Sequence, residues 1–168
     1  MSGPGQTMIG RRRLFAATLL CTVFLTGCSG TRPYQESSDK NVRFSTAVES
    51  GSWLSSVRAS VHVHSVDANC RTTYEGTIPL EGSTTLTGIP TGRPRYMVVS
   101  FDSSSFLLNS SSSINYATMF TPRRGYNYEI AVRYVDDTYN ATVEEVDRRS
   151  LARRELRRRP LDRCRAKG

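Results

Sequence analysis

One stretch decides the fold class of this chain: Tyr126-Asn127-Tyr128-Glu129-Ile130-Ala131-Val132-Arg133-Tyr134. Aromatic and aliphatic residues stand at every second position, with mostly polar residues between them. Alternate side chains of a β-strand point to opposite faces, so this pattern predicts a strand with one face in a core. Asp136-Asp137 follows, and then a second alternating run, 138–146, with Tyr139, Ala141 and Val143 on its apolar face. The two runs predict an antiparallel hairpin.

Similar runs occur earlier in the chain, separated by Gly, Pro, Asn and Asp at turn positions. They predict strands at 57–64, 71–80, 84–86, 95–101 and 116–120, and a shorter run lies at Val42-Arg43-Phe44. About seven short strands with no convincing helix among them predict an all-β fold, an antiparallel β-sandwich. Beyond it, residues 150–158 are predicted either as a short helix with Ser150 as its N-cap or as a basic tail.

A serine-rich stretch, residues 102–115, separates two of these strands. We predict a long loop there. Phe106-Leu107-Leu108, within it, is either an anchor tucked into the core or an exposed contact patch.

The chain length and the motif content argue against an enzyme. A chain of 168 residues favours one domain, which excludes a two-domain enzyme with separate cofactor and substrate halves. The sequence contains neither a G-x-S-x-G elbow nor a glycine-rich phosphate loop. The acid pairs Asp136-Asp137 and Glu144-Glu145 are adjacent, so their members point to opposite faces of a strand and do not form an acid/base dyad.

The N-terminus has the features of an export signal. Arg11, Arg12 and Arg13 precede the uncharged apolar run 14–24, which is shorter than the about 20 residues of a membrane-spanning helix. The run ends in Leu25-Thr26-Gly27-Cys28, which resembles the lipobox of bacterial lipoproteins. The resemblance implies cleavage before Cys28, a lipid on its sulfur, and, from Ser29, an outer-membrane anchor facing the periplasm. The alternative is an ordinary signal peptide or short anchor helix that happens to hold a cysteine.

These features divide the chain into four parts. We expect a signal peptide at 1–27, a flexible polar tether at 28–52, the sandwich at 53–147 and an Arg-rich segment at 148–168. Lipidation would leave Cys70 and Cys164 as the remaining thiols of the mature chain. In an oxidising compartment we expect them to form one disulfide, because no C-x-x-C metal spacing is present.

The positive charge is concentrated at the C-terminus. Residues 148–168 hold nine Arg and one Lys against Glu155 and Asp162, whereas 28–147 carries a net charge of −3. Guanidinium groups bind phosphates and carboxylates through paired hydrogen bonds. We expect an anionic envelope component or acidic partner, and not nucleic acid, to bind five of these residues: Arg153, Arg154, Arg157, Arg158 and Arg159. The alternative is a solvated segment with no specific ligand.

The two histidines, His62 and His64, share one face of the predicted strand. A two-residue turn within 67–70 would place Glu75 opposite His62, giving two imidazoles and a carboxylate suited to a divalent metal. The alternative is an ordinary His–Glu cross-strand pair on a solvated face.

The overall plan is similar to that of small transthyretin-like and carboxypeptidase-regulatory-like sandwiches found in envelope lipoproteins, including the type VI secretion lipoprotein. The similarity depends on Gly76-Thr77-Ile78-Pro79-Leu80 and Gly88-Ile89-Pro90-Thr91-Gly92. The similarity is one of architecture and covers residues 55–147. From the sequence as a whole we expect a lipid-anchored, non-catalytic interaction module, an accessory of a secretion or envelope complex, that makes contact through the basic segment and the serine-rich loop and whose one attached group is the lipid on Cys28. The alternative function is a small metal-binding lipoprotein that uses His62, His64 and Glu75.

Overall fold

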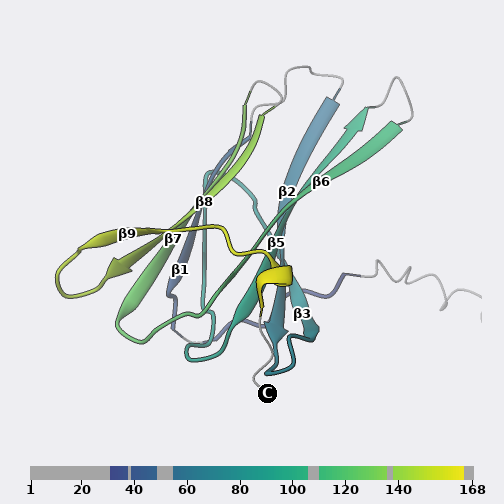
Figure 1. The fold of residues 1–168 in the computed structure, drawn as a ribbon. Helices are drawn as coiled ribbons and strands as arrows, with labels where there is room; N and C mark the ends of the chain where they lie inside the picture. The colour runs from purple at the N-terminus through teal and green to yellow at the C-terminus, as the bar shows by residue number, and fades with distance from the viewer. Residues whose placement is uncertain (1–30, 38, 49–54, 106–109, 136–137, 165–168) are drawn as a thin grey trace, which may run out of the picture. The chain divides into compact units, whose positions relative to one another are not determined.

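The computed structural model describes residues 31–37, 39–48, 55–105, 110–135 and 138–164. In this part of the chain, nine strands form two sheets that pack face to face, which confirms the all-β sandwich (Figure 1). No helix among these residues is long and apolar enough to cross a membrane.

The first sheet has the strand order β4-β1-β7-β8-β9. Strand β1 lies parallel to β7, and the other neighbours are antiparallel. The predicted hairpin is confirmed, with Ile130 opposite Val143. The bounds of the strands are Val42–Val48 (β1), Thr84–Thr87 (β4), Tyr126–Val135 (β7), Thr138–Asp147 (β8) and Arg153–Leu156 (β9).

The second sheet is antiparallel throughout, with the order β3-β2-β5-β6. Its strands are Ser55–Val66 (β2), Thr72–Pro79 (β3), Arg95–Ser105 (β5) and Ser110–Phe120 (β6). The long loop predicted at 102–115 is wrong, because the serines continue the β5–β6 hairpin, with Ser103 paired to Ser112. Phe106-Leu107-Leu108 lies outside the described residues.

The core forms where the apolar faces of the two sheets meet. Val61 and Val63 of β2 and Tyr128 and Val132 of β7 are fully buried, as their alternation along each strand requires. Such side chains each contribute about 1.5–3 kcal/mol on burial, so this face dominates the stability of the fold.

The tether predicted for 28–52 is wrong over the described residues of that range. Strand β1 lies between β4 and β7, and its Val42 and Phe44 are fully buried. Before it, the chain pairs with the edge of β3, where the Tyr34 amide donates to the Thr77 carbonyl at 2.9 Å. The few apolar residues of this stretch stand among polar ones, so its sequence is typical of a linker although it completes the sandwich.

The helix predicted at 150–158 is also wrong. The Asp147 carboxylate accepts hydrogen bonds from the amides of Arg149 and Ser150, and Leu151 adopts a left-handed φ of 58°. These local bonds reverse the chain where a helix would have to begin. The residues after this turn therefore form β9 beside β8.

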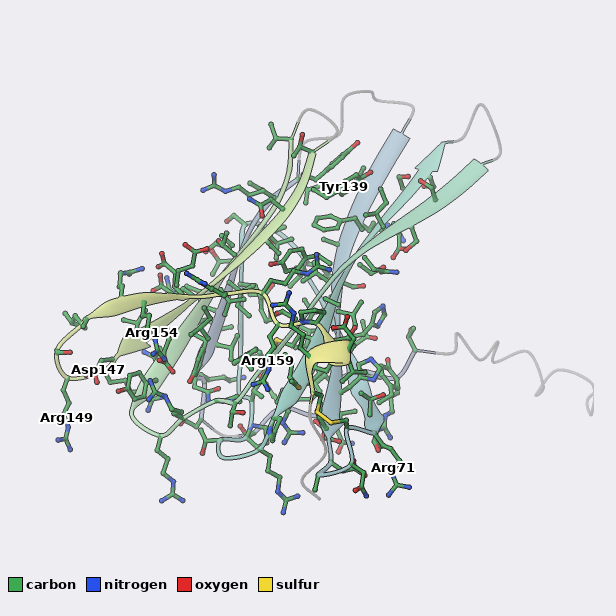
Figure 2. The ribbon with its side chains drawn as sticks, in the orientation of Figure 1. Arg71, Tyr139, Asp147, Arg149, Arg154 and Arg159 are labelled. Carbon is green, nitrogen blue, oxygen red and sulfur yellow. A yellow bond between two sulfur atoms is a disulfide. The ribbon has the colours of Figure 1, made fainter. Side chains whose placement is uncertain are left out.

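Beyond β9, residues 157–164 form what we call the C-terminal strap. Its Arg159 carbonyl accepts a hydrogen bond of 2.7 Å from the amide of Met119, so the strap extends from the first sheet to the β6 edge of the second. A short 3₁₀ turn, Leu161–Arg163, comes next. Cys164 then forms a disulfide with Cys70 at the turn between β2 and β3 (Figure 2).

Candidate functional site

His62 and His64 point away from the core, to the outer face of the second sheet, because Val61 and Val63 point inward. The predicted register is wrong. A bulge in β3 places His62 opposite Thr77 and His64 opposite Tyr74. Glu75 has no partner on β2, since a bulge inserts one extra residue into one strand of a pair.

Glu75 instead forms an ion pair with Arg95, the first residue of β5. The Arg95 side chain is only 5% exposed, and a buried guanidinium requires a carboxylate partner. The structure therefore does not bring the predicted metal ligands together. Among the residues it describes, no three His, Cys, Asp or Glu side chains are grouped so that they could hold a metal ion.

His64 packs between two tyrosines. Its ring centroid is 5.4 Å from that of Tyr74 and 6.0 Å from that of Tyr96. Burial lowers the pKa of His64, and the neighbouring His62 lowers it further, which outweighs the opposite effect of Glu75. The imidazole of His64 is therefore neutral at neutral pH, and it acts as part of an aromatic surface.

His62 is oriented by hydrogen bonds from β3. Its Nδ1 lies 2.7 Å from the Thr77 hydroxyl, which in turn lies 2.6 Å from the hydroxyl of Tyr74. This chain of contacts uses one imidazole nitrogen and leaves Nε2 as the atom with which His62 could meet a ligand.

Seven of the eight arginines described within 148–164 fall into two groups, and Arg149 belongs to neither. The first group is neutralised by carboxylates of the first sheet and of the segment before it: Arg148 by Asp39 at 2.9 Å, Arg153 by Glu129 at 2.7 Å and Glu144 at 2.9 Å, and Arg154 by Glu145 at 2.7 Å. The expectation that Arg153 and Arg154 bind an external anion is therefore not favoured, because their charge is already matched within the domain.

Glu145 is the one buried carboxylate among these ion pairs, with its side chain 4% exposed. Arg123 and Arg154 pair with it, and the Tyr128 hydroxyl donates to it at 2.8 Å. Burial would raise the pKa of Glu145, but these hydrogen bonds outweigh it and lower the pKa. Burial, together with the hydrogen bond to Glu145, raises the pKa of Tyr128 to about 12. This cluster is structural.

Glu144 and Glu145 lie on opposite faces of β8, as predicted. Glu144 is 41% exposed and pairs with Arg153, whereas Glu145 is buried. The other acid pair, Asp136-Asp137, lies outside the described residues.

The second group of arginines lies on the strap. Arg157, Arg158, Arg159 and Arg163 line a shallow groove of about 630 Å³, in which Asp162 is the single carboxylate among the described residues. Arg158 is held in place, because its Nε donates to the Ala117 carbonyl at 3.0 Å and its guanidinium lies 4.8 Å from the Tyr116 ring centroid. We call these four residues the arginine groove.

Figure 2 shows how an arginine of the strap and an arginine outside the strap differ in position. Arg159 lies beside the 3₁₀ turn, whereas Arg149 points away from the turn between β8 and β9. The sequence prediction included three members of the arginine groove and missed Arg163. The 3₁₀ turn brings Arg163 back toward Arg159, and the sequence carried no signal for that turn.

Cys70 and Cys164 lie at disulfide-bonding distance, with their Cα atoms 5.9 Å apart, as predicted. Cys70 adopts a positive φ of 64° in the turn after β2. The bond ties the end of the arginine groove to the second sheet. Cys28 and the signal-like segment lie outside the described residues.

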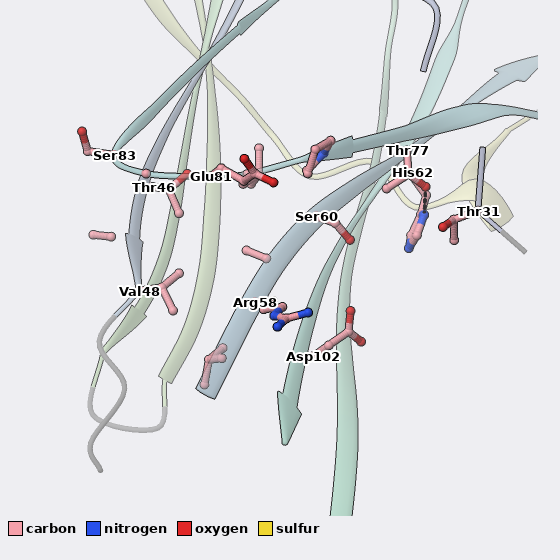
Figure 3. A pocket seen from close by; sticks show the side chains of 16 residues that line it. Thr31, Thr46, Val48, Arg58, Ser60, His62, Thr77, Glu81, Ser83 and Asp102 are labelled. Carbon is pink, nitrogen blue, oxygen red and sulfur yellow. Dashed lines mark hydrogen bonds between the residues drawn. The ribbon is translucent and has the colours of Figure 1, made fainter. Parts of the chain in front are cut away.

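A groove of about 1090 Å³ lies between the end of β1 and the first half of β2 (Figure 3). Thr46 and Val48 line one side, and Arg58 and Asp102, which face each other across β2 and β5, line the other. Its lining also includes His62 and Thr77, whose side chains are hydrogen-bonded to each other. Sequence reasoning gave no sign of this groove, because it depends on how the two sheets splay apart.

Comparison of the chain with models of protein families, with curated proteins and with solved structures gives no match, so its function has to be inferred from its own residues and their geometry.

Proposed function

We propose that this protein is a non-catalytic interaction module of the bacterial envelope, held to the outer membrane by lipid on Cys28 and facing the periplasm. It binds an anionic envelope component through the arginine groove. The observation that carries this proposal is the separation of the arginines into a neutralised group and a group with four guanidinium groups around one carboxylate.

The groove is suited to anions because it is preorganised. The backbone of Arg159 is bonded to β6, Arg158 packs on Tyr116, and the disulfide fixes the end of the strap. Side chains that are already ordered lose less conformational entropy when an anion binds. Each charge-assisted hydrogen bond to a phosphate or carboxylate is also stronger than a neutral one.

The cysteines support the proposed compartment. A disulfide between residues 70 and 164 is stable in an oxidising space and is uncommon in the cytosol. The resemblance of Leu25-Thr26-Gly27-Cys28 to a lipobox supplies the anchor. Incorporation of labelled palmitate, lost in Cys28→Ala, is the expected result in cells. An unlabelled wild-type protein would contradict the anchor.

Polyphosphate is a suitable probe of the arginine groove. We expect the triple variant Arg157→Ala/Arg158→Ala/Arg163→Ala to bind it about tenfold more weakly or worse, which corresponds to about 1.4 kcal/mol. The matched control is Arg124→Ala/Arg133→Ala/Arg149→Ala, which removes the same charge from exposed positions outside the groove. Added salt should weaken wild-type binding steeply, because exposed charges are screened. Equal losses in the two triple variants would show that net charge, and not the groove, binds the anion.

A further inference from the structure

The outer face of the second sheet carries a row of large side chains. Cross-strand partners share a face, and the register aligns Tyr74, His64, Tyr96 and Met119 across β3, β2, β5 and β6. Met119 is buried although it points outward from the sheet. It lines one hollow with Val66, Arg159 and Cys164, so these two residues of the strap adjoin this end of the outer face.

The N-terminal part of the chain reaches the same face. Thr31 lines a shallow hollow with residues from all four strands of the sheet, among them His62, Tyr74, Val98 and Asn115. Figure 3 shows Thr31 beside His62 and Thr77. Three peptide steps separate Thr31 from Cys28, and a fully extended chain covers at most about 3.6 Å in each, or about 11 Å in all.

The positive charges around this row of large side chains would attract an anionic surface. Arg32 donates to the Tyr74 carbonyl at 2.6 Å, and its guanidinium lies 5.8 Å from the Tyr74 ring centroid. The arginine groove lies at the strap end of the row. Tyrosines, with an apolar ring and a polar hydroxyl, favour the level of lipid headgroups.

We propose that the outer face of the β3-β2-β5-β6 sheet rests on the membrane, with anionic lipid headgroups bound in the arginine groove and with Tyr74 and Tyr96 at headgroup level. This inference depends on the proposed function, because it requires lipid on Cys28. So short a link keeps Thr31, which adjoins this face, within about 11 Å of the anchored residue. The outer face of the first sheet, where Glu129 and Glu144 match Arg153, points away from the lipid.

The test uses the full lipidated protein in vesicles of phosphatidylcholine and phosphatidylglycerol that contain a headgroup nitroxide. The chain has one Trp, Trp53, so a Trp53→Phe background permits single-tryptophan probes. Tyr96→Trp reports on the proposed membrane face. The matched control is Thr142→Trp, in mid-strand on the outer face of β8. Circular dichroism establishes that each variant is folded.

We expect the nitroxide to quench most of the fluorescence of the Tyr96→Trp protein and little of that of the Thr142→Trp protein. Adding Arg157→Ala/Arg158→Ala/Arg163→Ala should reduce quenching at position 96, as should replacing phosphatidylglycerol with phosphatidylcholine. Equal quenching at the two positions, or stronger quenching at 142, would overturn the orientation.

The failures of the two proposals can be distinguished. If the protein incorporates palmitate and binds polyphosphate through the groove, but position 96 is not quenched, the proposed function stands and the membrane contact is wrong. The groove then binds a soluble or protein-borne anion. If palmitate is not incorporated, or the groove variants bind polyphosphate as the wild type does, the proposed function itself is wrong.

Discussion

Asn41 is a polar residue buried in the sandwich, with 1% of its surface exposed. Its side-chain amide donates to the Ile89 carbonyl at 2.9 Å and accepts from the Ile89 amide at 2.8 Å. These two bonds fasten the loop after β4 to the start of β1. Neither could be read from the sequence, because the partners are far apart along the chain.

Replacing Asn41 removes both bonds and leaves two buried backbone groups without partners. We expect Asn41→Ala to lower the free energy of unfolding by about 2–3 kcal/mol, measured by urea denaturation. Asn140→Ala, at an exposed position of β8, is the control and should change it by less than about 0.5 kcal/mol. Similar effects of the two changes would show that the Ile89 contact contributes nothing.

Glu145 makes stability depend on pH in the acid range. Its pKa in the folded protein lies below the ordinary value of 4.5, so its contribution is complete above that value and is lost as the pH falls through the folded pKa. The free energy of unfolding of the wild type should therefore fall more steeply between about pH 5 and pH 3 than that of Glu145→Gln, whose amide does not titrate in that range. Urea denaturation across this range measures both slopes, and parallel slopes would contradict the role of the Glu145 cluster.

At the scale of one residue, alternation predicted which side chains of 126–134 face the core, because that information is local. It did not predict the His62–Thr77 pair. A bulge adds one residue to β3 beside Gly76, and a glycine inside a strand, which often marks a bulge, was the one local sign of it. The bulge takes Glu75 out of register with His62, and Glu75 pairs with Arg95 instead. The predicted set of metal ligands is therefore not brought together.

At the scale of elements, the segment before β1 packs on both sheets through two glycines, Gly76 in β3 of the second sheet and Gly88 just after β4 of the first. A Cβ on Gly88 would lie 2.1 Å from the Ser37 carbonyl oxygen, and one on Gly76 would lie 2.5 Å from the Tyr34 Cα. The glycines of the two motifs that resembled envelope sandwiches are thus required by the backbone that packs on them. The polar sequence of 31–41 gave no sign of this packing.

Gly88→Ala should therefore displace the segment before β1. We expect a loss of about 1–3 kcal/mol of stability, as for overpacked cores, and faster hydrogen exchange of the Ser37 amide, which donates to the Gly88 carbonyl at 2.9 Å. Gly82→Ala is the control, since a Cβ there meets no atom within 4 Å, although its φ of 74° carries its own strain. Unchanged exchange at Ser37 in Gly88→Ala would rule out the steric explanation.

At the scale of the whole molecule, the strap joins the two sheets. It leaves β9 of one sheet, bonds to the β6 edge of the other and ends at the disulfide. The sequence predicted the disulfide by counting cysteines. It could not predict the path between them, because the charge pattern alone does not distinguish arginines that pair with carboxylates from those that line a groove.

Removing the disulfide should free the strap. We expect Cys70→Ser/Cys164→Ser to lose up to about 4–5 kcal/mol of stability, because the bond closes a long loop in the unfolded chain. Hydrogen exchange of the Met119 amide, which donates to Arg159, should speed up more than that of the Val143 amide within β8. If both amides keep their protection, the β6 edge holds the strap without the covalent link.

The strap is also the part of the described chain that a ribosome makes last. Until residues 157–164 have emerged, Val66 and Met119 have no cover on the outward side of their sheet. A nascent chain, or one shortened by a premature stop codon, therefore displays an apolar strip of the kind that chaperones hold and quality-control proteases recognise. The outward side of this sheet is complete only when residues 157–164 have been synthesised and have docked.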